Sequence, residues 1–289
     1  MPELPEVETI RRELQHAIKG KQLKNFWSNW PKKVQPKPKV LEQKIASQRV
    51  KDIKRRAKIL IIELGSGECI TIHLKLTGQL IYKPKTRHSK LVYGGHPQRG
   101  GLDNLPNKFT HHFFTFTDGS NLFFNDLRKF GWIKLSSRKE IDQLVTDSGV
   151  EPFDQKFKLE TFATILKRYP NRPIKQLLLD QRLISGLGNI YVDESCFAAR
   201  IRPTRRVKSL RGVEVTALFR AIPKILQLAI DKKGTSTDQY VQLDGKPGGM
   251  MPFLKVYGRG QQPCKRCKTS ITKIQFNGRG THFCPYCQR

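Results

Sequence analysis

The first six residues, MPELPE, combine groups that can act as a nucleophile and as a proton carrier. If Met1 is removed, Pro2 carries a free secondary amine, and an α-amino group titrates at about 7.7–8, so part of it is unprotonated near neutral pH. Such an amine attacks an electrophilic carbon and forms a charged iminium, which is a Schiff base. Glu3 stands beside it and can move protons. The structural alternative is that Pro2 opens a helix and that Glu3 and Glu6 suit its positive end.

Four cysteines near the other end of the chain have the spacing of a metal site. Cys264, Cys267, Cys284 and Cys287 form a Cys-x2-Cys-x16-Cys-x2-Cys array, and four thiolates at this spacing can close a tetrahedral zinc site. Because four sulfur ligands leave no open position, the expected single zinc ion is structural. Disulfides are the alternative, which the absence of a recognisable secretory signal disfavours.

The composition indicates a polyanionic partner. The 289 residues contain 54 Lys and Arg against 24 Asp and Glu, a net charge of +30, and such an excess favours nucleic acid as the partner. An anionic membrane surface is the alternative. We expect no membrane association and a cytoplasmic location, because no apolar run approaches the roughly 20 residues that span a bilayer.

Hydrophobic periodicity predicts the elements that must position these groups. Residues 2–18 predict one amphipathic helix. Alternating stretches predict strands over 69–82, 113–117 and 121–135, with a long loop over 83–110. Further helices are expected over 138–147, 158–169, 174–182, 190–199 and 211–233.

The sequence also predicts two turns and a lid. Gly186 and Gly188 allow a tight junction between two helices. Residues 234–253 predict a flexible loop or lid. The segment between the two cysteine pairs predicts a β-hairpin that turns at Asn277-Gly278 and carries Arg279.

The ordered set of motifs resembles that of the formamidopyrimidine-DNA glycosylases, in the superfamily shared with endonuclease VIII. The resemblance covers nearly the whole chain. It rests on PELPEVET at 2–9, RRAK at 55–58, HLKLTG at 73–78, NDLRKFG at 125–131, LDQ at 179–181, GLGNIYVDE at 186–194, VYGR at 256–259 and GRGTHFC at 278–284.

This resemblance implies an α+β multidomain fold. The expected parts are a catalytic β-sandwich with an N-terminal helix at 1–137, and a helix–two-turn–helix DNA-binding domain at 138–235. A lid or linker at 236–254 and a β-hairpin with a four-cysteine zinc site at 255–289 follow. The partner implied is double-stranded DNA that contains damaged bases or abasic sites, bound by a monomer that associates with the nucleoid through its DNA.

The activity implied is base-excision repair of oxidised purines such as 8-oxoguanine and formamidopyrimidines. Pro2 would attack the deoxyribose C1′ and expel the base, with Glu3 as the proton shuttle. The Schiff base would then undergo β- and δ-elimination. Lys58 would contact a phosphate and assist β-elimination, and Arg279 would hold the flanking phosphates and take part in δ-elimination. For Lys58 the alternative is a place in a solvated basic cluster.

A base inside a duplex must leave the stack before an enzyme can act on it. By resemblance, Leu76, Arg128 and Phe130 fill the gap that it leaves. Arg128 would hydrogen-bond the orphaned cytosine and Phe130 would wedge the stack. Core packing is the alternative for Leu76 and Phe130.

Five further residues are expected at the DNA interface. Asn189 would hydrogen-bond the lesion's phosphates, with helix capping as a second role. His73 is expected to contact a phosphate rather than serve as a core histidine. Glu6 would face the catalytic site, and Arg172 and Tyr257 are additional candidates for DNA contacts.

The chain departs from the family pattern at several positions. Leu76 stands where methionine is usual, and Phe109 replaces a histidine that contacts DNA, so this contact is not expected here. Asp238 occupies a lid position that is commonly basic, which bears on the preferred lesion.

Two other functions fit part of the sequence. An endonuclease VIII-like enzyme would prefer oxidised pyrimidines. A non-catalytic zinc-ribbon protein that binds nucleic acid would explain the basic tail and the cysteines, but it gives no reason for Pro2-Glu3 together with Lys58.

Overall fold

The computed structural model describes residues 2–85, 92–95, 102, 104–235 and 248–289. The chain forms two compact units, one of Met1–Val145 with Lys232–Gly249 and the other of Thr146–Asp231 with Met250–Arg289. None of the described helices combines the length and the apolar character needed to cross a bilayer. The finer division into four parts stays a prediction.

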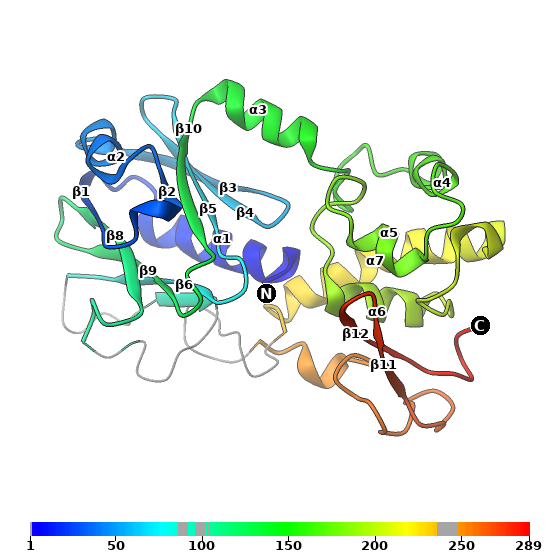
Figure 1. Ribbon diagram of the computed structural model, residues 1–289. Coiled ribbons are helices and arrows are strands. Elements are labelled where there is room, and N and C mark those ends of the chain that lie inside the picture. The colour runs from blue at the N-terminus through cyan, green and yellow to red at the C-terminus, as the bar shows by residue number, and fades with distance from the viewer. Residues whose placement is uncertain (1, 86–91, 96–101, 103, 236–247) are drawn as a thin grey trace. The chain divides into compact units, whose positions relative to one another are not determined.

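Two five-stranded sheets form a β-sandwich in the first unit (Figure 1). One sheet has the order β1 (Leu23–Ser28), β8 (Thr110–Phe116), β9 (Asn121–Asp126), β6 (Gly78–Lys83) and β7 (Val92–Gly95). The other has the order β2 (Val34–Gln35), β10 (Trp132–Ser136), β5 (Cys69–His73), β4 (Ile59–Leu64) and β3 (Val50–Arg56). Alternate apolar side chains of both sheets, such as Ile72 and Phe114, share one buried core. The predicted β-sandwich is confirmed.

Helix α1 (Leu4–Ile18) covers the edge of the sandwich formed by β3, β4 and β7. Its buried residues Val7, Ile10, Leu14 and Ile18 recur at helical spacing and belong to the sandwich core. Burying each of these side chains contributes roughly 1.5–3 kcal/mol. The helix predicted over 2–18 is therefore confirmed, with Glu3 as the residue before its first turn.

Shorter elements complete the first unit. They are the 3-10 turn Pro31–Lys33, α2 (Pro38–Ile45) and α3 (Arg138–Asp147), whose last residues pass into the second unit.

The strands predicted over 69–82 and 121–135 are each wrong as single strands. Residues 69–82 divide into β5 and β6, which belong to different sheets. The chain folds back so tightly at Gly78 that a Cβ there would lie 2.4 Å from the Leu74 carbonyl oxygen, so a side chain is excluded. Residues 121–135 divide into β9 and β10 around an irregular loop at 127–131.

The loop predicted over 83–110 also contains a strand, β7, which pairs with β6. At Gly95 a Cβ would lie 2.4 Å from the Gly78 carbonyl oxygen, so two glycines let these strands approach.

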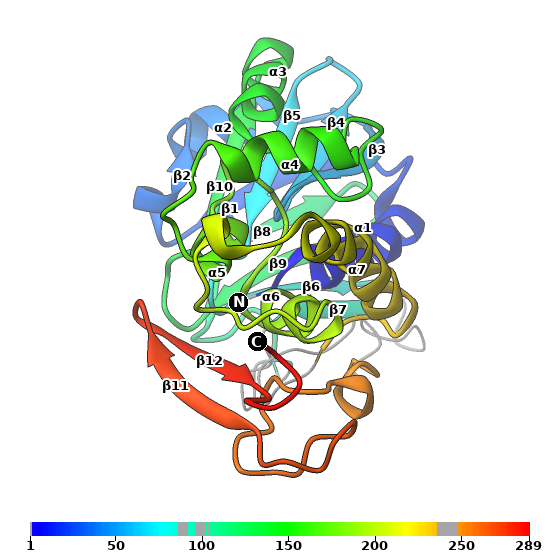
Figure 2. The ribbon, with the colours of Figure 1, turned by 90° about the vertical axis from the view of Figure 1, so that its right-hand side faces the viewer.

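The second unit is helical with one small hairpin (Figure 2). Its helices are α4 (Leu159–Lys167), α5 (Ile174–Leu179), α6 (Asn189–Ala198) and α7 (Gly212–Asp231), with 3-10 turns at Val207–Ser209 and Met251–Phe253. All four helices lie within three residues of the predicted bounds. The hairpin consists of β11 (Thr272–Phe276) and β12 (Arg279–Phe283). Its turn residues Asn277 and Gly278 have φ of 50° and 72°, as the predicted tight turn requires.

A buried histidine makes the stability of the sandwich depend on pH. His112 stacks on Phe124 and its Nδ1 lies 2.8 Å from the Ser28 hydroxyl. Burial first, and the charge of His111 second, lower the pKa of His112 to about 3. Because histidine in an unfolded chain titrates near 6.5, only the unfolded state takes up a proton here between about pH 6.5 and 3. Stability contributed by His112 is therefore complete above pH 6.5 and is lost as the pH falls through this window.

We predict that lowering the pH from 6.5 to 5.0 reduces the free energy of unfolding of His112→Gln by about 2 kcal/mol less than that of the parent. Urea unfolding at the two pH values measures this difference. His16→Gln, which changes an exposed histidine on α1, is the matched control and should behave as the parent. Equal acid sensitivity of the parent and His112→Gln would contradict the assignment.

Candidate active site and zinc site

One buried carboxylate fixes the start of the chain. Pro2, Glu3 and Glu6 are all buried, with Glu3 3% and Glu6 2% exposed. The Glu6 carboxylate accepts the Glu3 backbone N–H at 2.9 Å and the Thr235 backbone N–H at 2.8 Å. It therefore ties Pro2-Glu3 to the first turn of α1 and to the residue that precedes the undescribed segment 236–247, in which Asp238 lies. Glu6 therefore holds the Pro2-Glu3 end in place.

Lys58 lies in the hairpin turn between β3 and β4. Ala57, with φ of 52°, makes this turn, and the Arg55 guanidinium donates to the Ala57 carbonyl at 2.7 Å. The same guanidinium pairs with Glu8 of α1 at 3.2 Å, which fastens the hairpin to the helix. Lys58 is only 5% exposed, so the alternative of a solvated basic cluster is wrong for this residue.

His73 lies at the same end of the sandwich as Lys58, since it pairs with Ile59 across β4 and β5. Burial, followed by the charges of Lys75 and Lys58, lowers the pKa of His73 to about 3. Its Nδ1 accepts the Lys75 backbone N–H at 2.9 Å. A neutral imidazole whose Nδ1 accepts carries its proton on Nε2, so His73 offers a hydrogen-bond donor rather than a charge.

The loop between β9 and β10 is organised by Asp126, which is 1% exposed. Its carboxylate accepts the backbone N–H groups of Arg128 at 3.2 Å and Gly131 at 2.7 Å. The Thr77 hydroxyl donates to the same carboxylate and accepts the Arg128 N–H at 3.0 Å. These bonds hold the backbone on both sides of Phe130.

This loop presents the predicted wedge residues to the surface. The Arg128 guanidinium lies 4.8 Å from the centre of the Phe130 ring. Phe130 is 44% exposed, so the core-packing alternative is wrong for it. Leu76 is partly buried in the turn before β6 rather than in a strand. Sequence reasoning missed Asp126 as the residue that shapes this loop, although it lies within a motif noted above.

In the second unit, the Asn189 side chain binds the backbone of Gly280, the residue after Arg279. The Asn189 side-chain amide, in the first turn of α6, donates to the Gly280 carbonyl at 2.9 Å. The Lys175 ammonium donates to the same carbonyl at 3.2 Å. Arg279 follows directly on the hairpin turn, so these two bonds fix the backbone beside it.

A cavity of about 320 Å³ gathers the cations of this region, because Arg172, Lys175 and Arg279 all line it. Arg172 also pairs with Asp180 at 3.1 Å. With Arg182, four cationic side chains line this cavity beside the carboxylate of Asp180, which makes it a suitable site for phosphate oxygens.

A buried ion pair holds the hairpin on the helices. The Lys175 ammonium lies 2.7 Å from the Asp193 carboxylate, and their side chains are 1% and 0% exposed. The second Asp193 oxygen accepts the His282 backbone N–H at 2.9 Å. Sequence reasoning missed this pair. Its only signal is a lysine in a short helix whose other residues, apart from Gln176, are apolar.

Glu194, which follows Asp193 in α6, is also a buried carboxylate that accepts hydrogen bonds from the backbone. Glu194 accepts the backbone N–H groups of Lys255, Val256 and Tyr257 at 2.9–3.0 Å. Burial raises the pKa of Glu194, while these three donors oppose the shift. The Tyr257 ring packs edge-on against His282 at 5.0 Å, so the candidate DNA-contacting tyrosine is fixed from both sides.

The four predicted ligands converge on one zinc site. The sulfurs of Cys264, Cys267, Cys284 and Cys287 all lie within 4.8 Å of one another. The sulfur–sulfur distances are 4.0 Å for Cys264–Cys287 and 3.4 Å for Cys267–Cys284. Sulfurs around a tetrahedral zinc with bonds of about 2.3 Å lie about 3.8 Å apart. The set therefore fits one structural zinc ion, whereas Cys69 and Cys196 are buried free thiols.

A β-sandwich with a buried Pro2, a helical unit with a zinc hairpin and a net charge of +30 are the features expected of a protein that binds nucleic acid. Three family models match the chain. They are the formamidopyrimidine-DNA glycosylase N-terminal domain at 1–133, the formamidopyrimidine-DNA glycosylase H2TH domain at 148–240, and the zinc finger found in FPG and IleRS at 261–289.

Curated relatives match over the full length. The chain is 38% identical to the formamidopyrimidine-DNA glycosylase of Enterococcus faecalis, covering 100% of this chain and 98% of the relative. It is 39% identical to that of Streptococcus mutans, covering 100% of both. The chain belongs to the formamidopyrimidine-DNA glycosylase family.

Solved structures agree with this assignment. The complex of Lactococcus lactis Fpg with DNA containing an abasic site matches with a TM-score of 0.87, 34% identity and 99% coverage of both chains. The complex of MutM with DNA containing carbocyclic 8-oxo-G matches with a TM-score of 0.86, 34% identity and 100% coverage of both chains.

We predict that Asp193→Asn destabilises the second unit by about 3–5 kcal/mol, because it leaves the Lys175 ammonium buried without a counter-charge. Thermal unfolding and zinc release measure the effect. Asp231→Asn, at an exposed position at the end of α7, is the matched control and should change stability by less than about 0.5 kcal/mol. A loss for Asp193→Asn no larger than that of the control would refute the importance of this pair.

Proposed function

We propose that this protein is a base-excision DNA repair enzyme, a bifunctional glycosylase and abasic-site lyase that acts on oxidised purines in double-stranded DNA. The observation that carries the proposal is the buried Pro2-Glu3 end, held by Glu6 at the start of α1, in a chain that covers 98% of its Enterococcus faecalis relative. The substrate class follows that of the relatives, which are named for formamidopyrimidine-DNA.

The position of Pro2 favours its reactivity once Met1 is removed. Burial disfavours the charged form of an amine. The positive end of α1 adds to this effect, because it repels a neighbouring cation. Both influences favour the neutral nitrogen, which is the nucleophilic form.

The proposed first step exchanges one bond at the sugar for another. The Pro2 nitrogen bonds to C1′ as the bond from C1′ to the base breaks, and the base leaves with a proton. Glu3 carries protons in this step and assists opening of the sugar ring. The product is an iminium between Pro2 and C1′.

The iminium then serves as the electron sink for two eliminations. Loss of a C2′ proton expels the 3′ phosphate, and a second proton loss expels the 5′ phosphate. Lys58 and Arg279 assist these departures by pairing with phosphate oxygens. Arg172 and Asn189 bind the neighbouring backbone in the proposed complex.

The remaining candidates support base extrusion and binding. Arg128 would occupy the place of the extruded base and Phe130 and Leu76 would fill the gap. His73 would donate its Nε2 proton to a phosphate. We place Tyr257 at the interface as well.

One chain holds all the groups of the proposed reaction, so we propose that it acts as a monomer. We also propose that it works in the cytoplasm, where DNA binding associates it with the nucleoid.

The test compares release of 8-oxoguanine paired with cytosine and of thymine glycol, together with cleavage of abasic DNA. We expect faster release of 8-oxoguanine. Pro2→Gly, or retention of Met1, should lower both activities by roughly two orders of magnitude or more. Pro5→Ala, which changes the second proline but leaves the amine, is the matched control and should remain active.

Faster release of thymine glycol would instead support an endonuclease VIII-like enzyme. Binding of damaged DNA without release of either base or cleavage of abasic DNA would support a non-catalytic zinc-ribbon protein. Full activity with Met1 retained would rule out the Pro2 amine as the nucleophile.

A further inference from the structure

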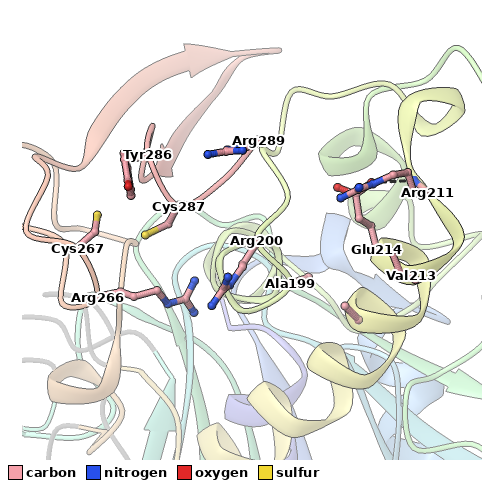
Figure 3. Close-up of a pocket in the computed structure, with 11 residues that line it drawn as sticks. Ala199, Arg200, Arg211, Val213, Glu214, Arg266, Cys267, Tyr286, Cys287 and Arg289 are labelled. Atoms are coloured by element: carbon pink, nitrogen blue, oxygen red, sulfur yellow. Dashed lines mark hydrogen bonds and ion pairs between the residues drawn. The ribbon is translucent and has the colours of Figure 1, made fainter.

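A second basic cavity lies at the C-terminal end of α6. Its volume is about 560 Å³, and Figure 3 shows side chains from three parts of the second unit around it. The lining includes Arg200 after α6, Val213 and Glu214 on α7, and Arg266 and Tyr286 from the zinc segment. Two zinc ligands, Cys267 and Cys287, also line the cavity, and no role proposed above uses the other lining residues.

Positive side chains predominate around this cavity, which also borders the zinc ligands Cys267 and Cys287. Within the part of the chain that the structure describes, the guanidinium groups of three lining residues have no carboxylate partner: Arg200, Arg266 and Arg289. The side chains of Arg200 and Arg266 point toward each other in Figure 3. Two facing cations repel, and an anion between them removes this repulsion.

The acidic residue at the cavity does not supply that anion. Glu214 pairs with Arg205 at 2.6 Å and with Arg211 at 3.4 Å. These hydrogen-bonded pairs, with the pair to Arg205 first, lower the pKa of Glu214 to about 2. Its charge is therefore matched by two other guanidinium groups.

The cavity also has exposed apolar groups at its edge. Val213 is 71% and Tyr286 67% exposed, and both line the cavity. The Arg266 guanidinium is itself supported by the Phe197 ring, 4.4 Å below it. A ligand that fits this lining combines negative charges with an apolar side chain.

This cavity is separate from the Arg279 cavity. Asn189 lies in the first turn of α6 and Arg200 follows the last, so the helix of 10 residues separates them by roughly 15 Å. Strand β12 separates Arg279 from the zinc ligands by a similar distance, its 5 residues spanning roughly 17 Å. A ligand at one cavity leaves the other accessible.

Duplex DNA is a poor match for this cavity. The volume of the cavity lies within the range of about 300–1,000 Å³ that is typical of small-ligand sites. A duplex offers phosphates on a convex backbone and has no exposed apolar side chain to place beside Val213 and Tyr286. Arginine clusters are a recurring device for binding acidic peptide motifs.

We propose that this cavity binds an acidic peptide segment of a partner protein. Carboxylates of the segment pair with Arg200 and Arg266, and apolar side chains pack against Val213 or Tyr286, which lie on opposite sides of the cavity in Figure 3. The protein would thus hold a partner on the second unit while Arg279 and Asn189 remain free for DNA.

The test uses the full chain with its zinc and a fluorescein-labelled peptide that has two aspartates on each side of a phenylalanine. Anisotropy is measured at physiological salt with a saturating duplex that carries an uncleavable tetrahydrofuran analogue of the abasic site, so that the DNA surface stays occupied. We expect Arg200→Gln with Arg266→Gln to weaken peptide binding at least tenfold and DNA binding less than twofold. Arg220→Gln with Lys224→Gln, exposed on α7 outside the cavity, removes the same charge and should change peptide binding less than twofold.

Arg200→Glu is a second variant that leaves the zinc segment unchanged, and it should abolish peptide binding with full zinc content. Three results would overturn the proposal. They are displacement of the peptide by the duplex, equal loss in the control variant, and a matching loss of DNA binding in the cavity variant. Because base release is not measured, the outcome is independent of the proposed catalytic function.

Discussion

The Glu6 carboxylate makes the interactions on which the position of the proposed reacting end, Pro2-Glu3, depends. Its two oxygens accept N–H groups from residues far apart in sequence, Glu3 and Thr235. The first turn of a helix has free N–H groups, and a carboxylate at this position satisfies one of them while it also fixes the preceding residues. Without it, Pro2 would be the frayed end of a chain. With it, the proline is buried in one place.

The same device recurs at three other places that carry proposed functional residues. Asp126 holds the loop of Arg128 and Phe130, and Asp193 holds the hairpin of Arg279. Glu194 accepts three backbone N–H groups around Tyr257. Charged hydrogen bonds of this kind are among the stronger ones. Acidic side chains are few in this basic protein. Four of them are buried and bind backbone N–H groups in the interior. Their charges therefore do not lie on the surface, which stays positive for DNA.

Parts of this account were predictable because local chemistry decides them. The spacing of Val7, Ile10 and Leu14 predicted α1, and Asn277-Gly278 predicted the hairpin turn. The cysteine spacing predicted the zinc site. The breaks at Gly78 and at 127–131 were not predictable from alternation, because the chain there changes from one sheet to the other. The Lys175–Asp193 pair was also missed, since sequence does not show which polar residue finds a buried partner. The roles of Pro2, Lys58 and Arg279 rested on resemblance to the family.

The most direct measurement identifies the atom that bonds to the sugar. Abasic-site DNA is incubated with the protein, the Schiff base is reduced with borohydride, and the adduct is digested and sequenced by tandem mass spectrometry. The account predicts the sugar remnant on the nitrogen of Pro2, in a peptide that lacks Met1. A remnant on the ammonium nitrogen of Lys58, or on any other lysine, would contradict it.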